Sequence, residues 1–180
     1  TTALNSYIKF LCMGLLMLIP AISVIFPIMI NESYADAKQL VPYYLLATIV
    51  SCISSFFGNI FTAIKKNNVL FYTTVAGSVV NVVSVHLLLP VVGVQGASIA
   101  LFLGFMVNNA IRAYLLKKEI QVSIDLKFIV AWAIVYIGVS YIYLHANAII
   151  NVLTVFVGGL LTLFVFRKEL KEILGTIKNR

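Results

Sequence analysis

Six apolar stretches, each about as long as a helix that crosses a lipid bilayer, fill most of this chain. They cover residues 7–30, 40–64, 69–89, 95–116, 128–144 and 149–166. A helix needs about 20 apolar residues to cross the roughly 30 Å of hydrocarbon in a membrane. Composition agrees, because 11% of the residues are charged, whereas soluble domains carry about 25%. The pattern therefore predicts an all-α fold, a polytopic bundle of six transmembrane spans.

The distribution of Lys and Arg over the gaps predicts how these spans are oriented. The gaps after the first, third and fifth spans hold only Lys38, whereas the other two gaps and the C-terminal tail hold ten basic residues, namely Lys65, Lys66, Lys117, Lys118, Lys127, Arg167, Lys168, Lys171, Lys178 and Arg180. By the positive-inside rule, both ends of the chain are expected in the cytoplasm. The net charge of +7 is then explained by membrane lipid with anionic headgroups, and no nucleic-acid partner is expected.

Several features bear on domain organisation and chemistry. The chain does not begin with Met, so we expect a fragment or an internal start. Its longest hydrophilic stretches, 117–127 and 167–180, are too short to bury a separate core. There is no glycine-rich phosphate loop, nucleophile elbow or histidine pair at metal spacing, so we expect no enzyme, no metal and no cofactor. Cys12 and Cys52 lie within apolar spans, which favours packing over a disulfide or metal site.

Small and polar residues recur at helical spacing in the second, third and fourth spans. An unpaired polar group facing lipid costs several kcal/mol, so these faces either line a path for a polar solute or hold helices together. The candidate cavity residues are Arg112, Asn108, Asn81, Asn59 and His86.

Two of these candidates have a second interpretation at the membrane surface. Arg112 lies about one turn from the end of its span, so its side chain either snorkels to the cytoplasmic surface or lines a cavity. His86 lies near the outer end of the third span and either faces a solute or lies at the outer interface.

The order of features in the first four spans resembles a known transporter family. Pro20 in the first span precedes an outer loop containing Tyr34, Ala35, Asp36 and Ala37. Asn81 in the third span precedes residues 89–100, which read Leu-Pro-Val-Val-Gly-Val-Gln-Gly-Ala-Ser-Ile-Ala. Over residues 8–118 this pattern looks like the polysaccharide flippases of the multidrug/oligosaccharidyl-lipid/polysaccharide exporter superfamily, which export O-antigen, lipopolysaccharide and capsule units. Ser98 departs from a common Ala, and Leu101 stands where Thr is frequent.

The resemblance implies that residues 1–118 are the last four helices of the C-terminal lobe of a two-lobe, alternating-access transporter. Residues 119–180 would be an appended pair of transmembrane helices with a short cytoplasmic tail. The implied substrate is an undecaprenyl-pyrophosphate-linked oligosaccharide, which is moved from the inner to the outer leaflet of the bacterial cytoplasmic (inner) membrane during polysaccharide biosynthesis. Arg112 would bind the pyrophosphate, and Asn108 and Asn81 the sugar. The implied partners are the N-terminal half of the same transporter and the polysaccharide polymerase machinery.

Two other functions remain open at this point. A multidrug or cation antiporter of the same superfamily would share the fold, but it usually needs membrane carboxylates, and no Asp or Glu lies within any span. A non-transporting membrane scaffold would be expected to have uniform Leu-rich packing, and the polar faces of the second to fourth spans count against it.

Overall fold

The computed structural model describes residues 2–31, 37–119 and 124–167, and it shows six helices and no strand within these ranges. The helices are α1 (Thr2–Met29), α2 (Val41–Ala63), α3 (Asn67–Val92), α4 (Gln95–Glu119), α5 (Leu126–His145) and α6 (Ala148–Val165). All six are long and apolar enough to cross a membrane. The predicted six-span, all-α bundle is therefore confirmed, and the chain is a multi-pass membrane protein. The described helices begin and end within about one turn of the predicted spans, apart from an earlier start of α1.

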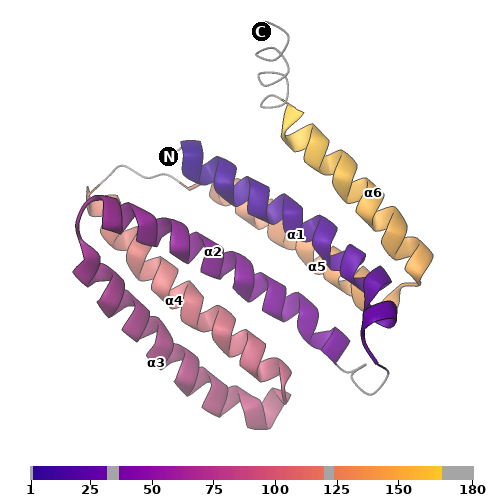
Figure 1. Ribbon diagram of the computed structural model, residues 1–180, viewed down its shortest axis with the longest axis horizontal. Helices are drawn as coiled ribbons and strands as arrows, with labels where there is room; N and C mark the ends of the chain where they lie inside the picture. Colours follow the sequence, from indigo (N-terminus) through magenta and orange to yellow (C-terminus); the bar gives the residue numbers. More distant parts are fainter. Residues whose placement is uncertain (1, 32–36, 120–123, 168–180) are drawn as a thin grey trace, which may run out of the picture.

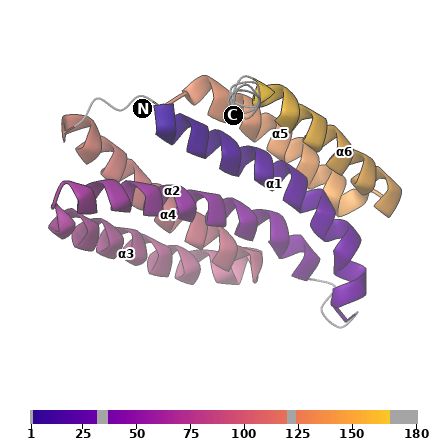
Figure 2. The ribbon, with the colours of Figure 1, turned by 45° about the horizontal axis from the view of Figure 1, so that its top comes forward.

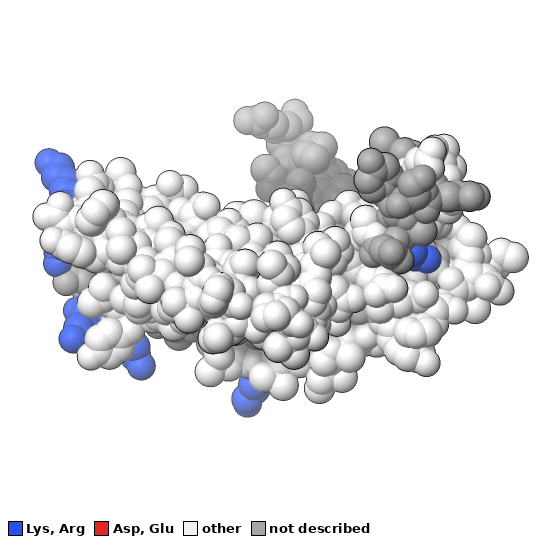
Figure 3. All heavy atoms as spheres, turned by 90° about the horizontal axis from the view of Figure 1, so that it is seen from below, with Lys and Arg blue, Asp and Glu red and all other residues white. Residues whose placement is uncertain are grey.

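Successive helices run in opposite directions, so their connections lie at two ends of the bundle (Figure 1). The α2–α3 turn, the end of α4 and the start of α5 lie toward one end, while the α1–α2, α3–α4 and α5–α6 connections lie at the other, from which α6 runs back obliquely. The first of these ends carries Lys65, Lys66, Lys117, Lys118 and Lys127. Figure 3 shows basic side chains gathered toward one end of the face that it draws. The charge asymmetry matches the predicted topology, and the assignment of this end to the cytoplasm stays a prediction.

The helices pack as two groups of three, α2 with α3 and α4, and α1 with α5 and α6 (Figure 2). In the first group α4 packs closely against both α2 and α3, which touch each other little. In the second group α5 and α6 both pack against α1 and have few contacts with each other. The two helices predicted as an appended pair, α5 and α6, thus pack against α1. The assignment of residues 1–118 to a transporter lobe stays a prediction.

Two aromatic side chains of α5 donate hydrogen bonds to backbone carbonyl groups, one within the α1, α5 and α6 group and one across to α2. Trp132 on α5 donates its indole N–H to the carbonyl oxygen of Cys12 on α1, over 2.8 Å. Tyr136, one turn further along α5, donates to the carbonyl oxygen of Pro42 on α2. Both rings are buried. Because a buried indole or phenol needs a partner for its polar group, these contacts fix α5 against α1 and α2.

The run from Leu89 to Ala100, on which the family resemblance depends, forms the turn between α3 and α4. Gly93 ends α3 with a φ of 67°, a conformation that favours glycine. A Cβ atom placed on Gly96 would lie 2.8 Å from the carbonyl oxygen of Leu88, so only glycine allows α4 to begin so close to α3. Both glycines of this motif are therefore explained by the tight turn between α3 and α4.

Candidate functional site

The guanidinium group of Arg112, on α4, lies inside the α2–α4 group and donates hydrogen bonds to α2 and α3. Its Nε donates to Thr73 Oγ1 over 2.9 Å, and its Nη2 donates to Thr74 Oγ1 over 3.0 Å. Its Nη1 donates to both the carbonyl oxygen and the Oγ of Ser54, over 2.7 and 2.9 Å. These bonds account for four of the five guanidinium N–H groups. Arg112 on α4 thereby connects α2 to α3.

Arg112 does not snorkel to the membrane surface, because its side chain is only 6% exposed. A Cβ atom placed on Gly58 of α2 would lie 3.5 Å from Nη1, an ordinary van der Waals contact, so the guanidinium packs beside this glycine. All four hydrogen bonds go to uncharged groups, and Asp125, the one acid whose side chain the structure describes, binds the backbone N–H of Phe128 at the start of α5. Within the described residues, the positive charge of Arg112 is therefore solvated only by hydroxyl and carbonyl dipoles.

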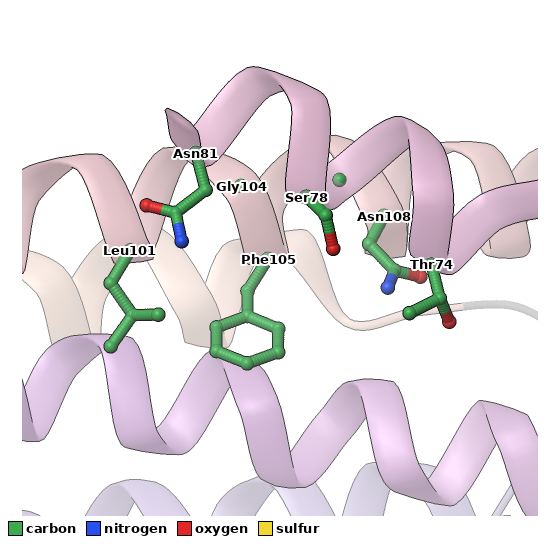
Figure 4. Close-up of a pocket in the computed structure, with 8 residues that line it drawn as sticks. Thr74, Ser78, Asn81, Leu101, Gly104, Phe105 and Asn108 are labelled. Carbon is green, nitrogen blue, oxygen red and sulfur yellow. The ribbon is translucent and has the colours of Figure 1, made fainter. Parts of the chain in front are cut away.

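A small notch, lined more by apolar than by polar surface, lies beside Arg112 in the interface between α3 and α4. It has a volume of about 70 Å³. Its lining consists of Thr74, Gly77, Ser78 and Asn81 from α3, and Leu101, Gly104, Phe105 and Asn108 from α4 (Figure 4). Thr74 belongs to the notch and also accepts the hydrogen bond from Arg112. The cation and the notch are thus parts of one polar site within membrane-spanning helices.

The amide oxygens of Asn81 and Asn108 are buried and accept no hydrogen bond from any described residue. Asn108 is 5% exposed, and its neighbour on the notch, Ser78, is exposed. A buried acceptor without a donor costs about 1–3 kcal/mol, so it is ordinarily satisfied by water or by a ligand. The notch has room for about two water molecules. Both oxygens are inaccessible to a water-sized group, whereas the amide nitrogens of Asn81 and Asn108 make no hydrogen bond with the described residues and are not fully buried, so the notch presents N–H donors to a molecule that enters it.

The other two predicted site residues do not belong to this notch. Asn59 follows Gly58 on α2, but its side chain is exposed. His86 is also exposed, toward the outer end of α3, where it lines a shallow groove with Val82, Val85, Leu89 and Pro90. The structure therefore brings Arg112, Asn108 and Asn81 together and leaves Asn59 and His86 apart from them. The roles of all five residues in binding stay predictions.

Sequence reasoning missed the specific partners of Arg112. Ser54 and Thr74 belong to the small and polar residues that recur at helical spacing in the second and third spans, whereas Thr73 does not. It also missed Asn109, whose amide nitrogen donates to the carbonyl oxygen of Val50 on α2 over 2.8 Å. Counted from the ends of α2, α3 and α4 at the end of the bundle that carries Lys65, Ser54, Thr73 and Arg112 lie nine, six and seven residues deep, a difference that a long arginine side chain can span.

No family model, curated protein or solved structure matches this chain. The resemblance to polysaccharide flippases therefore depends on the sequence motifs alone, and any function must be inferred from the site.

Proposed function

We propose that this chain is part of a membrane transporter that moves an undecaprenyl-pyrophosphate-linked oligosaccharide from the inner to the outer leaflet. The observation that carries this proposal is the buried Arg112, whose charge no described carboxylate neutralises, beside the notch lined by Asn81 and Asn108. Ionisable residues inside membrane spans are costly, and they commonly mark the path of a substrate. A phosphate-bearing glycolipid would supply the negative charge and the hydroxyl groups that such a site lacks.

Polar side chains on the surface of the α2–α4 group support a second lobe as partner. Ser55 and Asn59 on α2 and Thr74 and Ser78 on α3 are exposed on this chain. Within a membrane, such a surface is covered by protein or faces a water-filled cavity. A second group of helices from the same transporter would cover part of this surface and enclose a water-filled cavity against the rest. Substrate would lie between the two lobes in an alternating-access cycle.

A membrane scaffold is the second candidate function, and one observation favours it. The four hydrogen bonds of Arg112 all go to groups of the same chain, and the glycines of α3 and α4 are explained by close helix packing. In a scaffold, these features would hold helices together without any ligand. The orphan oxygens of the notch are the feature that a purely structural role leaves unexplained.

Deleting the gene from its host bacterium and measuring surface polysaccharide tests the proposal. We expect the deletion to abolish surface polysaccharide and to leave lipid-linked repeat units in the inner leaflet. The complete gene should restore export, whereas residues 1–180 alone should insert into the membrane without restoring it. Unchanged surface polysaccharide would refute the flippase. Increased sensitivity to cationic drugs in the same deletion strain would instead support the antiporter.

A further inference from the structure

We propose that the notch between α3 and α4 binds a small monovalent anion, of the size and charge of chloride, as the counter-ion of Arg112. The notch offers hydrogen-bond donors, and it lies beside a buried positive charge that no described carboxylate neutralises. A buried charge within a membrane span is costly unless it is paired. Arg112 needs a counter-ion whatever the chain transports, so this site stands apart from the flippase proposal.

Four side chains bring donor groups to the notch. They are the amide nitrogens of Asn81 and Asn108 and the hydroxyl groups of Thr74 and Ser78. None of the four donates a hydrogen bond to a described residue. Figure 4 shows the two amide nitrogens pointing to the same side as the Ser78 hydroxyl. Because the amide oxygens of both asparagines are closed off, an ion in the notch meets N–H and O–H groups.

Thr74 links the notch to the charge of Arg112. Its Oγ1 accepts a hydrogen bond from Nη2 of Arg112 over 3.0 Å, so its own proton is left for another acceptor. A hydroxyl that is polarised by a cation in this way donates a stronger hydrogen bond. The second N–H of Nη2 is the one guanidinium N–H without a described acceptor. An anion bound to the Thr74 hydroxyl therefore lies close to the positive charge.

The charge count decides the class of anion. Arginine stays protonated in proteins, so Arg112 carries one positive charge. No Asp or Glu lies within any of the six apolar spans to neutralise it. One monovalent anion would make the site neutral, whereas a phosphate monoester carries a charge of about −1.5 to −2 and would leave excess negative charge among apolar helices. A cation would meet both the donors and the guanidinium, and is disfavoured by each.

Chloride binding to the purified 180-residue chain tests this site. The chain is placed in nanodiscs of phosphatidylcholine, and the line width of the chloride NMR signal is measured, because it broadens when chloride exchanges with a protein site. Sodium gluconate replaces sodium chloride at constant ionic strength, since gluconate is too large for the notch. The titration gives the chloride concentration at which half of the broadening is reached.

We expect saturable broadening in the parent chain. Asn108→Leu should raise the half-saturating chloride concentration about tenfold, as expected for the loss of one hydrogen bond to a charged group. Asn109→Leu is the matched control, because Asn109 binds the Val50 carbonyl and does not line the notch. Ser78→Ala removes a donor at an exposed position and should raise that concentration several-fold, with Ser55→Ala, an exposed serine outside the notch, as its control. Should Asn108→Leu fail to fold, the serine pair provides the same test.

A second titration separates a free anion from the phosphate of a lipid. Sugar-free undecaprenyl pyrophosphate is added to the nanodiscs and compared with an equal charge of oleate, which reproduces the surface charge without a phosphate. We expect the two lipids to have the same effect on chloride binding, whereas bromide should displace chloride from the notch.

Three results would overturn the counter-ion site. Displacement of chloride by the pyrophosphate lipid but not by oleate would make the notch a site for lipid phosphate. Equal chloride binding by the parent chain, Asn108→Leu and Ser78→Ala would place the ion elsewhere, such as at the exposed lysines. Broadening that never saturates would show that no anion is bound. Normal surface polysaccharide in the deletion strain would refute the flippase alone, because the chloride titration does not depend on export.

Discussion

Gly77 on α3 and Gly104 on α4 bring the two helix backbones into direct contact. A Cβ atom placed on either glycine would lie 2.8 Å from the carbonyl oxygen of the other. The Cβ atom of Asn81 lies 2.9 Å from the Cβ placed on Gly104, and the Cβ atom of Asn108 lies 3.1 Å from the Cβ placed on Gly77. The two asparagines therefore flank this crossing. Small residues commonly allow such close approach between membrane helices. The glycines thereby set the width of the notch that the two asparagines line.

The crossing predicts that Gly104→Ala destabilises the protein. The added methyl group must push α3 and α4 apart, and we expect a loss of about 1–3 kcal/mol. The measurement is the temperature at which the purified chain loses its monodisperse peak in size-exclusion chromatography after heating in detergent. Gly138→Ala on α5 is the matched control, because a Cβ atom there meets nothing within 4 Å. Equal behaviour of the two variants would show that the helices do not touch at Gly104.

Arg112→Lys should also destabilise the chain, although it preserves the charge. A lysine carries its three donors on one nitrogen, so it cannot reach Ser54, Thr73 and Thr74 together as the guanidinium does. We expect a loss of about 1–3 kcal/mol, measured by the same heating series. Lys117→Ala, an exposed basic residue on the same helix, should change stability by less than about 0.5 kcal/mol. A silent Arg112→Lys would mean that Arg112 does not hold the three helices together.

The six spans could be predicted from the sequence because a bilayer imposes a length and an apolar composition on every helix that crosses it. Pairing of the helices could not be predicted in the same way, because it depends on side-chain packing between segments far apart in the chain. The contact of α1 with α6, where Gly158 packs against Leu16 and Met17, is an example. Nothing in the local pattern of either span specifies this partner.

The side-chain partners within the candidate site could not be predicted from the sequence either. Helical spacing placed Asn108 and Arg112 on one face of α4, and in the structure Asn108 lines the notch while Arg112 binds Thr74 at its edge. The pattern left open whether Arg112 reaches the surface, because a single span does not reveal which acceptors its neighbours supply. The answer depends on Ser54 and Thr73, which lie 58 and 39 residues away in the sequence.

Trp132→Phe should weaken the attachment of α5 to α1. The change keeps an aromatic ring but removes the N–H that binds the Cys12 carbonyl. Such a hydrogen bond contributes about 0.5–1.5 kcal/mol, so the variant should lose its native peak at a lower temperature. Tyr141→Phe on the same helix is the control, since its exposed hydroxyl makes no hydrogen bond with the described residues and its ring can still stack on His145. If both variants behave as the parent chain, the indole bond contributes nothing to stability.

The predicted orientation in the membrane can be tested with two single cysteines at opposite ends of the bundle. Asn67 begins α3 beside Lys65 and Lys66, and Asn147 precedes α6 at the other end, and both side chains are exposed. With Cys12 and Cys52 replaced by Ala, a membrane-impermeant thiol reagent should label Asn147→Cys in intact cells and Asn67→Cys only after lysis, because the basic end is expected in the cytoplasm. Labelling of only Asn67→Cys in intact cells would invert the orientation. Labelling of both would place the two ends on one side of the membrane and contradict the six-span topology.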